Sequence, residues 1–241
     1  MNNRFRNCFA NTHVVLPVVH VESPSQAVRN TRIACDAQCD GVFLINHGIS
    51  HAALMTAFSA VKEALPDFWI GINSLGEDPC NLFGNTEVSG IWTDNAQIDE
   101  RLGEQEKAEK IDDVRAKQDW PGLYFGGVAF KYQREVDELA AASRIAMRHM
   151  DVVTTSGPGT GHAPTVEKLK TMKEAMGEFP LAIASGVTPD NVSDLLPHCD
   201  CVMVATGISK SFTELDPALT RNLVESVREF SIRECYKYTT K

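Results

Sequence analysis

Short apolar runs recur along the chain, separated by longer amphipathic segments. Several runs, such as Gly41-Val-Phe-Leu-Ile-Asn46, are apolar almost throughout, which is typical of strands buried on both faces of a parallel sheet. Such strands need helices packed over them. The pattern predicts eight strands, over Val14–His20, Gly41–Asn46, Phe68–Asn73, Gly90–Asn95, Leu123–Val128, Asp151–Ser156, Pro180–Ser185 and Cys201–Thr206.

The segments between these runs place apolar residues at helical spacing. Helix faces are predicted at Val136, Leu139, Ser143, Met147 and Met150, at Val166, Leu169, Met172 and Met176, and at Leu219, Leu223, Val227 and Phe230. Helix starts are marked by a capping side chain followed by proline. These start signals are Ser23-Pro24-Ser25-Gln26, Thr188-Pro189 and Asp216-Pro217.

Strand and helix alternating eight times in 241 residues is the pattern of a single (β/α)₈ TIM barrel of the α/β class. An open, doubly wound sheet is the structural alternative. No linker or low-complexity tract divides the chain, so residues 1–241 are expected to form one barrel domain.

Composition narrows the range of partners. The chain has 32 acidic and 23 basic residues and a formal charge of −9, which disfavours nucleic acid. No apolar run is long enough to cross a membrane and the first residues do not resemble a secretory signal, so a cytoplasmic protein is expected. Seven cysteines without a CxxC pair argue against a disulfide framework or a zinc ribbon. The charged run over 99–117 is interpreted as a solvated helix face.

The active-site residues of a barrel of this kind lie where strands end and loops begin. Almost every predicted strand ends in polar residues, which predicts a ring of hydrogen-bonding groups around one mouth. For any single Asn or Ser, capping of a helix or a loop is an equal alternative. The ring consists of His20, Glu22, Asn46, His47, Asn73, Asp94, Lys131, Thr155 and Ser156.

Within this ring we assign the catalytic roles to Asp94, His20, Asn46 and Lys131. A carboxylate at a barrel mouth is partly desolvated, which raises its pKa and suits it to act as an acid or base. The other three would position or polarise the substrate. His47 and His51 have the spacing of a helical metal pair, but no motif supports them, so no metal and no cofactor are expected.

Glycine-containing loops follow the last strands. Ser185-Gly186 and Thr206-Gly207 lie after predicted strands seven and eight, where many barrels bind phosphate through loop amides. These four residues are the expected phosphate site. Short Gly turns are also common in such loops for structural reasons alone.

The segments Asp151-Val-Val-Thr-Thr-Ser-Gly-Pro-Gly-Thr-Gly161, Leu181-Ala-Ile-Ala-Ser-Gly-Val-Thr-Pro-Asp-Asn-Val192 and Cys201-Val-Met-Val-Ala-Thr-Gly-Ile-Ser-Lys210 resemble the BtpA/SgcQ family of predicted barrel proteins. The likeness is concentrated in the second half of the chain. In the first half, the family usually has a longer, proline-rich loop after strand one than this sequence has. The resemblance implies either an enzyme of sugar or nucleotide metabolism or a role in the accumulation of photosystem I proteins.

Some relatives carry the name adenine phosphoribosyltransferase. In this sequence Asp112-Asp113 is followed by Val114-Arg-Ala-Lys117 and not by a pyrophosphate-binding loop, which argues against that activity. We therefore expect an isomerase, lyase or hydrolase that acts on a small phosphorylated metabolite. The alternative is a noncatalytic assembly or stability factor. A homo-oligomer is also expected, and an apolar patch on the outer helices would support it.

Overall fold

The strands close into one parallel barrel. The structure is a computed structural model that describes the backbone of residues 4–239 and the side chains of residues 4–234. All eight strands are parallel in the order β1 to β8, and β8 pairs with β1. The predicted TIM barrel is confirmed, and each strand lies within its predicted run. The strands are β1 (Val14–His20), β2 (Val42–Ile45), β3 (Ile70–Asn73), β4 (Gly90–Thr93), β5 (Leu123–Gly127), β6 (Val152–Ser156), β7 (Leu181–Ala184) and β8 (Cys201–Val204).

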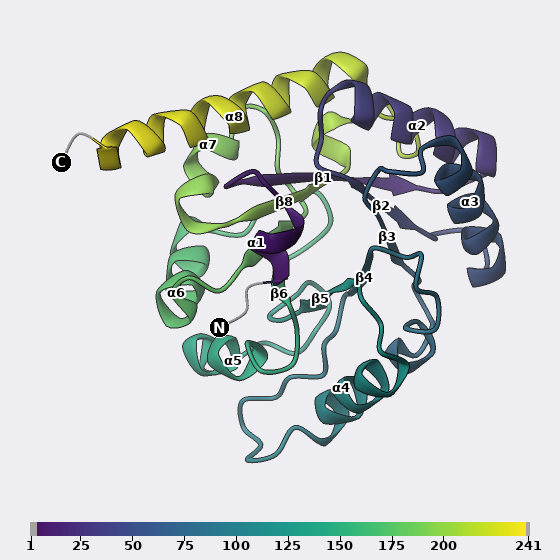
Figure 1. Cartoon of the computed structure of the whole chain (residues 1–241). Helices are drawn as coiled ribbons and strands as arrows, with labels where there is room; N and C mark the ends of the chain where they lie inside the picture. Colours follow the sequence, from purple (N-terminus) through teal and green to yellow (C-terminus); the bar gives the residue numbers. More distant parts are fainter. Residues whose placement is uncertain (1–3, 240–241) are drawn as a thin grey trace.

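Helices surround this barrel (Figure 1). They are α2 (Pro24–Asp36), α3 (His51–Ala64), α4 (Glu106–Gln118), α5 (Leu139–Ala146), α6 (Val166–Met176), α7 (Val192–Leu195) and α8 (Pro217–Thr239), with 3₁₀ turns η1 (Pro79–Asn81), η2 (Leu196–His198) and η3 (Thr206–Ile208). Within the described part of the chain, no helix has the length and apolar character needed to cross a bilayer.

Two of the three predicted helix starts are confirmed. The Ser23 hydroxyl accepts a hydrogen bond from the Gln26 amide at 3.3 Å, with Pro24 at the first helical position of α2. Asp216 caps α8 by accepting from the amides of Ala218 and Leu219. The third signal, Thr188-Pro189, does not open a helix directly. Thr188 and Asn191 bond to each other in a turn, and α7 begins only at Val192.

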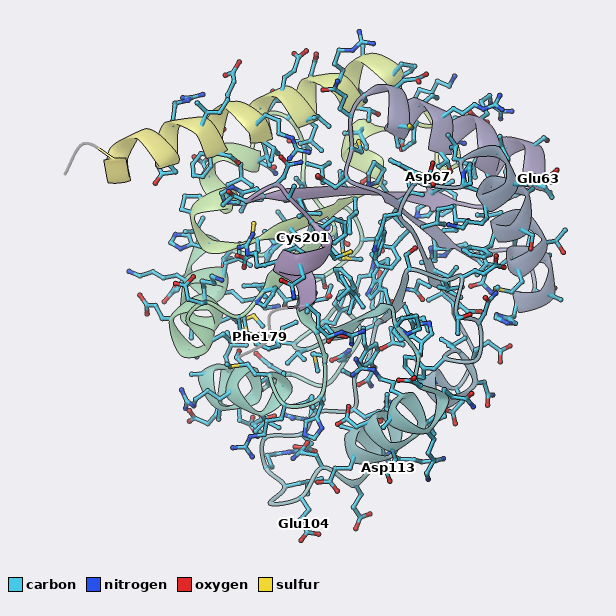
Figure 2. The ribbon with its side chains drawn as sticks, in the orientation of Figure 1. Glu63, Asp67, Glu104, Asp113, Phe179 and Cys201 are labelled. Carbon is cyan, nitrogen blue, oxygen red and sulfur yellow. The ribbon has the colours of Figure 1, made fainter. Side chains whose placement is uncertain are left out.

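The charged run over 99–117 is helical only from Glu106 onward. Residues 99–105 form a loop, in which Asp99 binds the Arg101 guanidinium and Glu100 binds that of Arg134. Most charged residues of the helical remainder are exposed, as predicted, whereas Ala108 and Ile111 are buried. Figure 2 shows Glu104 and Asp113 projecting from the outer edge of the molecule.

Alternation along the strands divides the buried side chains into two cores. One set points into the barrel and includes Leu16, Phe43 and Phe125. The other lies between strands and helices and includes Val15 and Leu44. This is the two-residue period expected of strands buried on both faces.

The amino-terminal end of the barrel is covered by α1 (Arg4–Cys8), a helix that the sequence pattern did not predict. Figure 1 shows α1 lying inside the ring of outer helices. Phe5 is fully buried, and its ring centroid lies 6.4 Å from that of Phe125 inside the barrel. The barrel is therefore filled and closed at this end, which leaves the opposite mouth for chemistry.

Candidate active site

The alternation of inward and outward residues determines which polar side chains reach the mouth. Val18 on β1 and Ile45 on β2 belong to the inner core. Two residues farther along, His20 and His47 continue the same inward face at the carboxyl ends of these strands. Trp92 on β4 is also an inner residue, so Asp94 occupies the equivalent position there.

The two histidines form a cluster with Phe212 from the loop after β8. The His20 ring lies 4.7 Å from that of His47 and 4.1 Å from that of Phe212, measured between centroids. The Nδ1 atom of His20 donates to the Phe212 carbonyl oxygen at 2.9 Å, because a carbonyl can only accept. This tautomer leaves Nε2 of His20 as a proton acceptor.

His20 is buried and His47 is exposed, but loss of hydration disfavours the charged form of both imidazoles. Loss of hydration and, as a smaller contribution, the nearby His47 lower the pKa of His20 to about 4. Burial also lowers the pKa of His47, with a smaller effect in the same direction from the Lys131 charge. Both imidazoles are therefore uncharged hydrogen-bonding groups at neutral pH.

Asp94 is held by its neighbour on β3. The Nδ2 atom of Asn73 donates to Oδ1 of Asp94 at 2.9 Å. Burial raises the pKa of the Asp94 carboxyl, and the Asn73 hydrogen bond and the Lys131 charge act in the opposite direction. Among the described residues, none bonds to Oδ2 of Asp94. That oxygen is available to exchange a proton with a bound molecule.

Lys131 enters the mouth from the loop after β5. Its flanking residues Ala129 and Tyr132 have φ of 49° and 62°, a left-handed conformation that costs non-glycine residues roughly 1–3 kcal/mol each. Its Nζ donates to the Ser185 hydroxyl at 3.3 Å, and its backbone amide donates to the Ser156 hydroxyl at 2.8 Å. The loop is thus bent in a way that directs a cation toward the ends of β6 and β7.

The charge of Lys131 acts on three other groups of the mouth, since it lowers the pKa values of His20, His47 and Asp94. His20, Asp94 and Lys131, which are far apart in sequence, therefore lie near one another at the mouth. His47, which the sequence analysis placed only in the outer ring, belongs to the same group.

Asn46 has a different environment. It continues the outward face of Leu44, and its amide group is used inside the protein. Oδ1 accepts from the Leu75 amide at 2.6 Å, and Nδ2 donates to the carbonyl of Ile49 at 3.2 Å and to that of Leu75 at 3.4 Å. These contacts fix the loops after β2 and β3, so the structure gives Asn46 a role in loop positioning.

The remaining rim residues also make contacts within the loops. Thr155 Oγ1 donates to the Ala129 carbonyl at 3.3 Å, and the buried Ser156 hydroxyl donates to the Gly157 carbonyl at 2.9 Å. Glu22 is exposed at the start of α2. Thr155 and Ser156 therefore position the loop that carries Lys131.

The glycines of the last two loops are required by packing between loops. A Cβ on Gly186 would lie 2.0 Å from the Ala163 nitrogen, and a Cβ on Gly207 would lie 1.9 Å from the Val187 oxygen. Ser185 and Gly186 both have positive φ, of 90° and 69°. Thr206 begins the 3₁₀ turn η3. The Ser185 hydroxyl, through Lys131, connects these loops to the rest of the mouth.

A small hairpin between β8 and α8 holds Phe212 in place. Ser209 and Leu215 form an antiparallel bridge, and the Lys210 amide donates to the Glu214 carbonyl at 2.9 Å. The buried Asn30 on α2 bonds to the second arm of the hairpin, donating to the Thr213 carbonyl at 3.1 Å and accepting from the Leu215 amide at 2.7 Å. The first helix of the barrel thus positions the last loop over His20.

Sequence reasoning did not find Phe212 or Lys168. Phe212 is an exposed aromatic residue in a loop, and nothing in its sequence context indicates that its carbonyl faces a histidine 192 positions earlier. Lys168 lies in the first turn of α6, where its Nζ donates to the backbone carbonyl oxygens of Ala129 and Ser156. A lysine on an outer helix normally indicates a solvated surface.

The possible metal ligands among the described residues are dispersed over the molecule. Among the residues that the structure describes, no three His, Cys, Asp or Glu side chains gather as a metal site would require. His51, considered above as part of a metal pair, bonds through Nδ1 to the Ser74 hydroxyl at 2.9 Å. Asp112 lies on the outer helix α4 and bonds to His149 Nδ1 at 2.6 Å.

Comparison with solved structures shows the same architecture in several enzymes. (S)-3-O-geranylgeranylglyceryl phosphate synthase from Thermoplasma acidophilum, in complex with its substrate sn-glycerol-1-phosphate, has a TM-score of 0.64 and 15% identity, covering 94% of this chain and 97% of that one. Thiamine phosphate pyrophosphorylase from Pyrococcus furiosus has a TM-score of 0.65 and 12% identity, covering 94% and 98%. Phosphoribosyl anthranilate isomerase from Thermus thermophilus has a TM-score of 0.63 and 13% identity, covering 90% and 98%. Identities this low establish the fold alone.

Sequence comparison adds a family. An uncharacterized protein from Archaeoglobus fulgidus is 25% identical over 199 residues, which cover 82% of this chain and 72% of the relative. The model of the BtpA family matches residues 128–229, the part of the chain that contains β6 to β8 and the three motifs quoted above. The resemblance predicted from those motifs is confirmed by this match, which covers residues 128–229.

Proposed function

We propose that the protein is an enzyme that acts on a small phosphorylated metabolite at the carboxyl mouth of the barrel. The observation that carries the proposal is the convergence of a carboxyl group, a cation and two neutral imidazoles, contributed by Asp94, Lys131, His20 and His47. Three structural neighbours, a geranylgeranylglyceryl phosphate synthase, a phosphoribosyl anthranilate isomerase and a thiamine phosphate pyrophosphorylase, support the substrate class.

Proton transfer is the chemistry that these groups support best. Asp94 would give or take a proton through Oδ2, because its raised pKa brings it nearer to neutral pH than an exposed aspartate. Lys131 would stabilise negative charge that develops on the substrate, and His20 would accept a hydrogen bond at Nε2. Such a transfer is shared by isomerisation, carbon-carbon cleavage and hydrolysis.

We place the phosphate group of this metabolite beside the loops after β7 and β8, at Ser185, Gly186, Thr206 and Gly207. The contact between Lys131 Nζ and the Ser185 hydroxyl supports this position. A phosphate there would meet loop amides and an ammonium group together, and hydrogen bonds to an anion from charged donors are the stronger kind.

The test is a titration of the isotopically labelled protein with inorganic phosphate and with sn-glycerol-1-phosphate, followed by backbone amide NMR. We expect concentration-dependent shifts at Ser185, Gly186, Thr206 and Gly207. Lys131→Met should weaken binding about tenfold, which corresponds to about 1.4 kcal/mol. The matched control is Lys170→Met, which removes an exposed lysine on α6. Shifts that avoid these loops, or equal affinity in both variants, would remove the phosphate site from this mouth.

The catalytic assignment has its own test. Turnover of a panel of sugar and nucleotide phosphates is compared between the parent and Asp94→Asn, which keeps the shape of the side chain but cannot exchange a proton as a carboxyl does. We expect the variant to bind the active compound and to lose at least about a hundredfold in kcat. A variant as active as the parent would contradict the role of Asp94.

We further propose a cytoplasmic homo-oligomer. Cys8, Cys35, Cys39, Cys80, Cys199 and Cys201 are free thiols, which fits a reducing compartment; Cys235 lies outside the residues whose side chains are described. For assembly, α8 carries the exposed apolar residues Leu219 and Ile232. Sedimentation of the parent and of Ile232→Lys tests this surface, since only an interface residue should shift the protein toward a monomer.

A further inference from the structure

A cavity of about 450 Å³ lies beside the barrel mouth, between the loops that follow β5 and β6. Its walls are the β5–α5 loop from Ala129 to Val136, residues 156–158 after β6, and the first turn of α6 at Thr165 and Lys168. Lys131 lies at the boundary between this cavity and the mouth. The other residues to which we assigned proton transfer or phosphate binding do not line the cavity.

Lys168 is the half-buried cation of this cavity. Its Nζ donates to the Ala129 carbonyl at 2.5 Å and to the Ser156 carbonyl at 2.7 Å. An ammonium group has three donors, so one N–H is left after these two contacts. The two carbonyls satisfy hydrogen bonds but carry no net charge, so the positive charge itself is not neutralised.

No counter-ion for Lys168 is found among the described side chains: its pKa is lowered to about 8 by burial, with no contribution from any charged neighbour. A desolvated charge of this kind is costly unless it is paired. The contacts of Lys168 with the Ala129 and Ser156 carbonyls hold the two loops together. A neutral side chain of similar length could also pack between these loops, without the cost of burying an unpaired charge.

The other charges of the cavity add to the imbalance. The lining includes Lys131, Arg134 and Lys168 as cations and Glu135 as its acidic residue. Arg134 is neutralised from outside the cavity by Glu100 and Asp99. Glu135 is exposed, and it does not contribute to the pKa of Lys168. Lys131 and Lys168 therefore leave the cavity positively charged.

We propose that this cavity binds a small oxyanion, with the Lys168 ammonium as its principal partner and Lys131 as a second cation. The ligand chemistry is that of a phosphate or carboxylate group. Such an anion would accept the third Lys168 hydrogen and supply the missing negative charge. The site shares Lys131 with the phosphate position proposed after β7 and β8, but it is centred on Lys168, and it stands whether or not that position binds phosphate.

The experiment is competitive acylation of the parent protein across pH, with each lysine quantified by peptide mass spectrometry. Only the neutral amine reacts, so the reaction reports a pKa for each lysine. In sodium chloride we expect Lys168 to titrate near 8. At the same ionic strength, phosphate or acetate should raise this pKa by about one unit, and labelling at neutral pH should then fall about tenfold.

Lys170 is the matched control, because it lies on the same helix but is exposed and pairs with Glu174. Its labelling should be the same in chloride, phosphate and acetate. A response to phosphate alone would assign the site to phosphoryl groups, and a response to both anions would extend it to carboxylates. Lys168 labelling that is equal in all three salts, or that falls in parallel with Lys170, overturns the proposal.

Two variants separate this site from the mouth. Lys168→Arg keeps the charge and should keep phosphate-dependent amide shifts at residues 156–158, whereas Lys168→Met should lose these shifts while leaving any shifts at Ser185 and Gly207 unchanged. Persistence of the shifts at residues 156–158 in Lys168→Met contradicts the proposal. Should Lys168→Met fail to fold, the labelling of the parent protein still decides the question.

Discussion

The imidazole rings of His20 and His47 meet edge to face at the barrel mouth, with centroids 4.7 Å apart and an interplanar angle of 72°. Two protonated imidazoles at this distance would repel each other in a partly desolvated site. His20 therefore remains neutral over the pH range in which an exposed histidine would already take up a proton.

This neutrality predicts a pH dependence of stability. The pKa of His20 is about 4 in the folded protein and about 6.5 in an unfolded chain, so the unfolded chain binds the proton first as pH falls. The stabilising effect is complete above about 6.5 and is lost between about 6.5 and 4, by on the order of 3 kcal/mol. Urea unfolding at about pH 7 and about pH 4.5 should show a smaller loss for His20→Gln than for the parent. Equal losses would show that His20 titrates normally.

The second prediction concerns Asn73. Its hydrogen bond to Oδ1 of Asp94 lowers the pKa of that carboxyl, so Asn73→Ala should raise the Asp94 pKa further. Carboxyl carbon NMR of Asp94 measures this directly. The matched control is Asn95→Ala, because Asn95 bonds only to the Gln97 amide among the described residues. An unchanged Asp94 pKa in Asn73→Ala would mean that the hydrogen bond has no effect on the charge of the carboxyl.

The third prediction concerns packing of the last two loops. A Cβ on Gly207 would lie 1.9 Å from the Val187 oxygen, whereas one on Gly48 meets no atom within 4 Å. Gly207→Ala should therefore destabilise the protein by about 1–3 kcal/mol, and Gly48→Ala should be close to neutral. Denaturant unfolding without any anion measures both. If Gly207→Ala unfolds like the parent, the loops are more adaptable than this contact indicates.

The fourth prediction concerns the closed end of the barrel. Phe5 is fully buried and packs against Phe9 and Phe125, so Phe5→Ala should cost about 3–5 kcal/mol. Leu102→Ala, at an exposed side chain, should change stability by less than about 0.5 kcal/mol. Thermal and urea unfolding give both values. A loss in Phe5→Ala no larger than that in Leu102→Ala would show that α1 contributes little to the core.

The fold could be predicted from the sequence because apolar runs and caps act locally. The alternation within each run also contained information on the site: the inward series that ends in His47 is Phe43, Ile45, His47, and Asn46 lies on the other face. Following this period to the end of the strand would have chosen His47 over Asn46 as a mouth residue.

Other parts of the site depend on contacts between distant segments. α1 is too short to show helical periodicity, and it is stabilised by the barrel interior. The Phe212 carbonyl and the Lys168 ammonium meet partners that no local pattern specifies. Gly186 and Gly207 are likewise required because a neighbouring loop packs against each of them. The sequence alone does not distinguish this requirement from one imposed by a bound anion.

The hairpin between β8 and α8 also has a consequence for the order of assembly during synthesis. The hairpin residues Phe212, Thr213 and Leu215 belong to the last strand–helix unit of the barrel. Their hydrogen-bond partners, His20 and Asn30, belong to the first. Contacts between such distant residues require closure of a long loop, which slows their formation. A ribosome-bound chain that lacks the last unit cannot complete the environment of His20. The mouth therefore reaches its folded arrangement only when the two ends of the barrel have met.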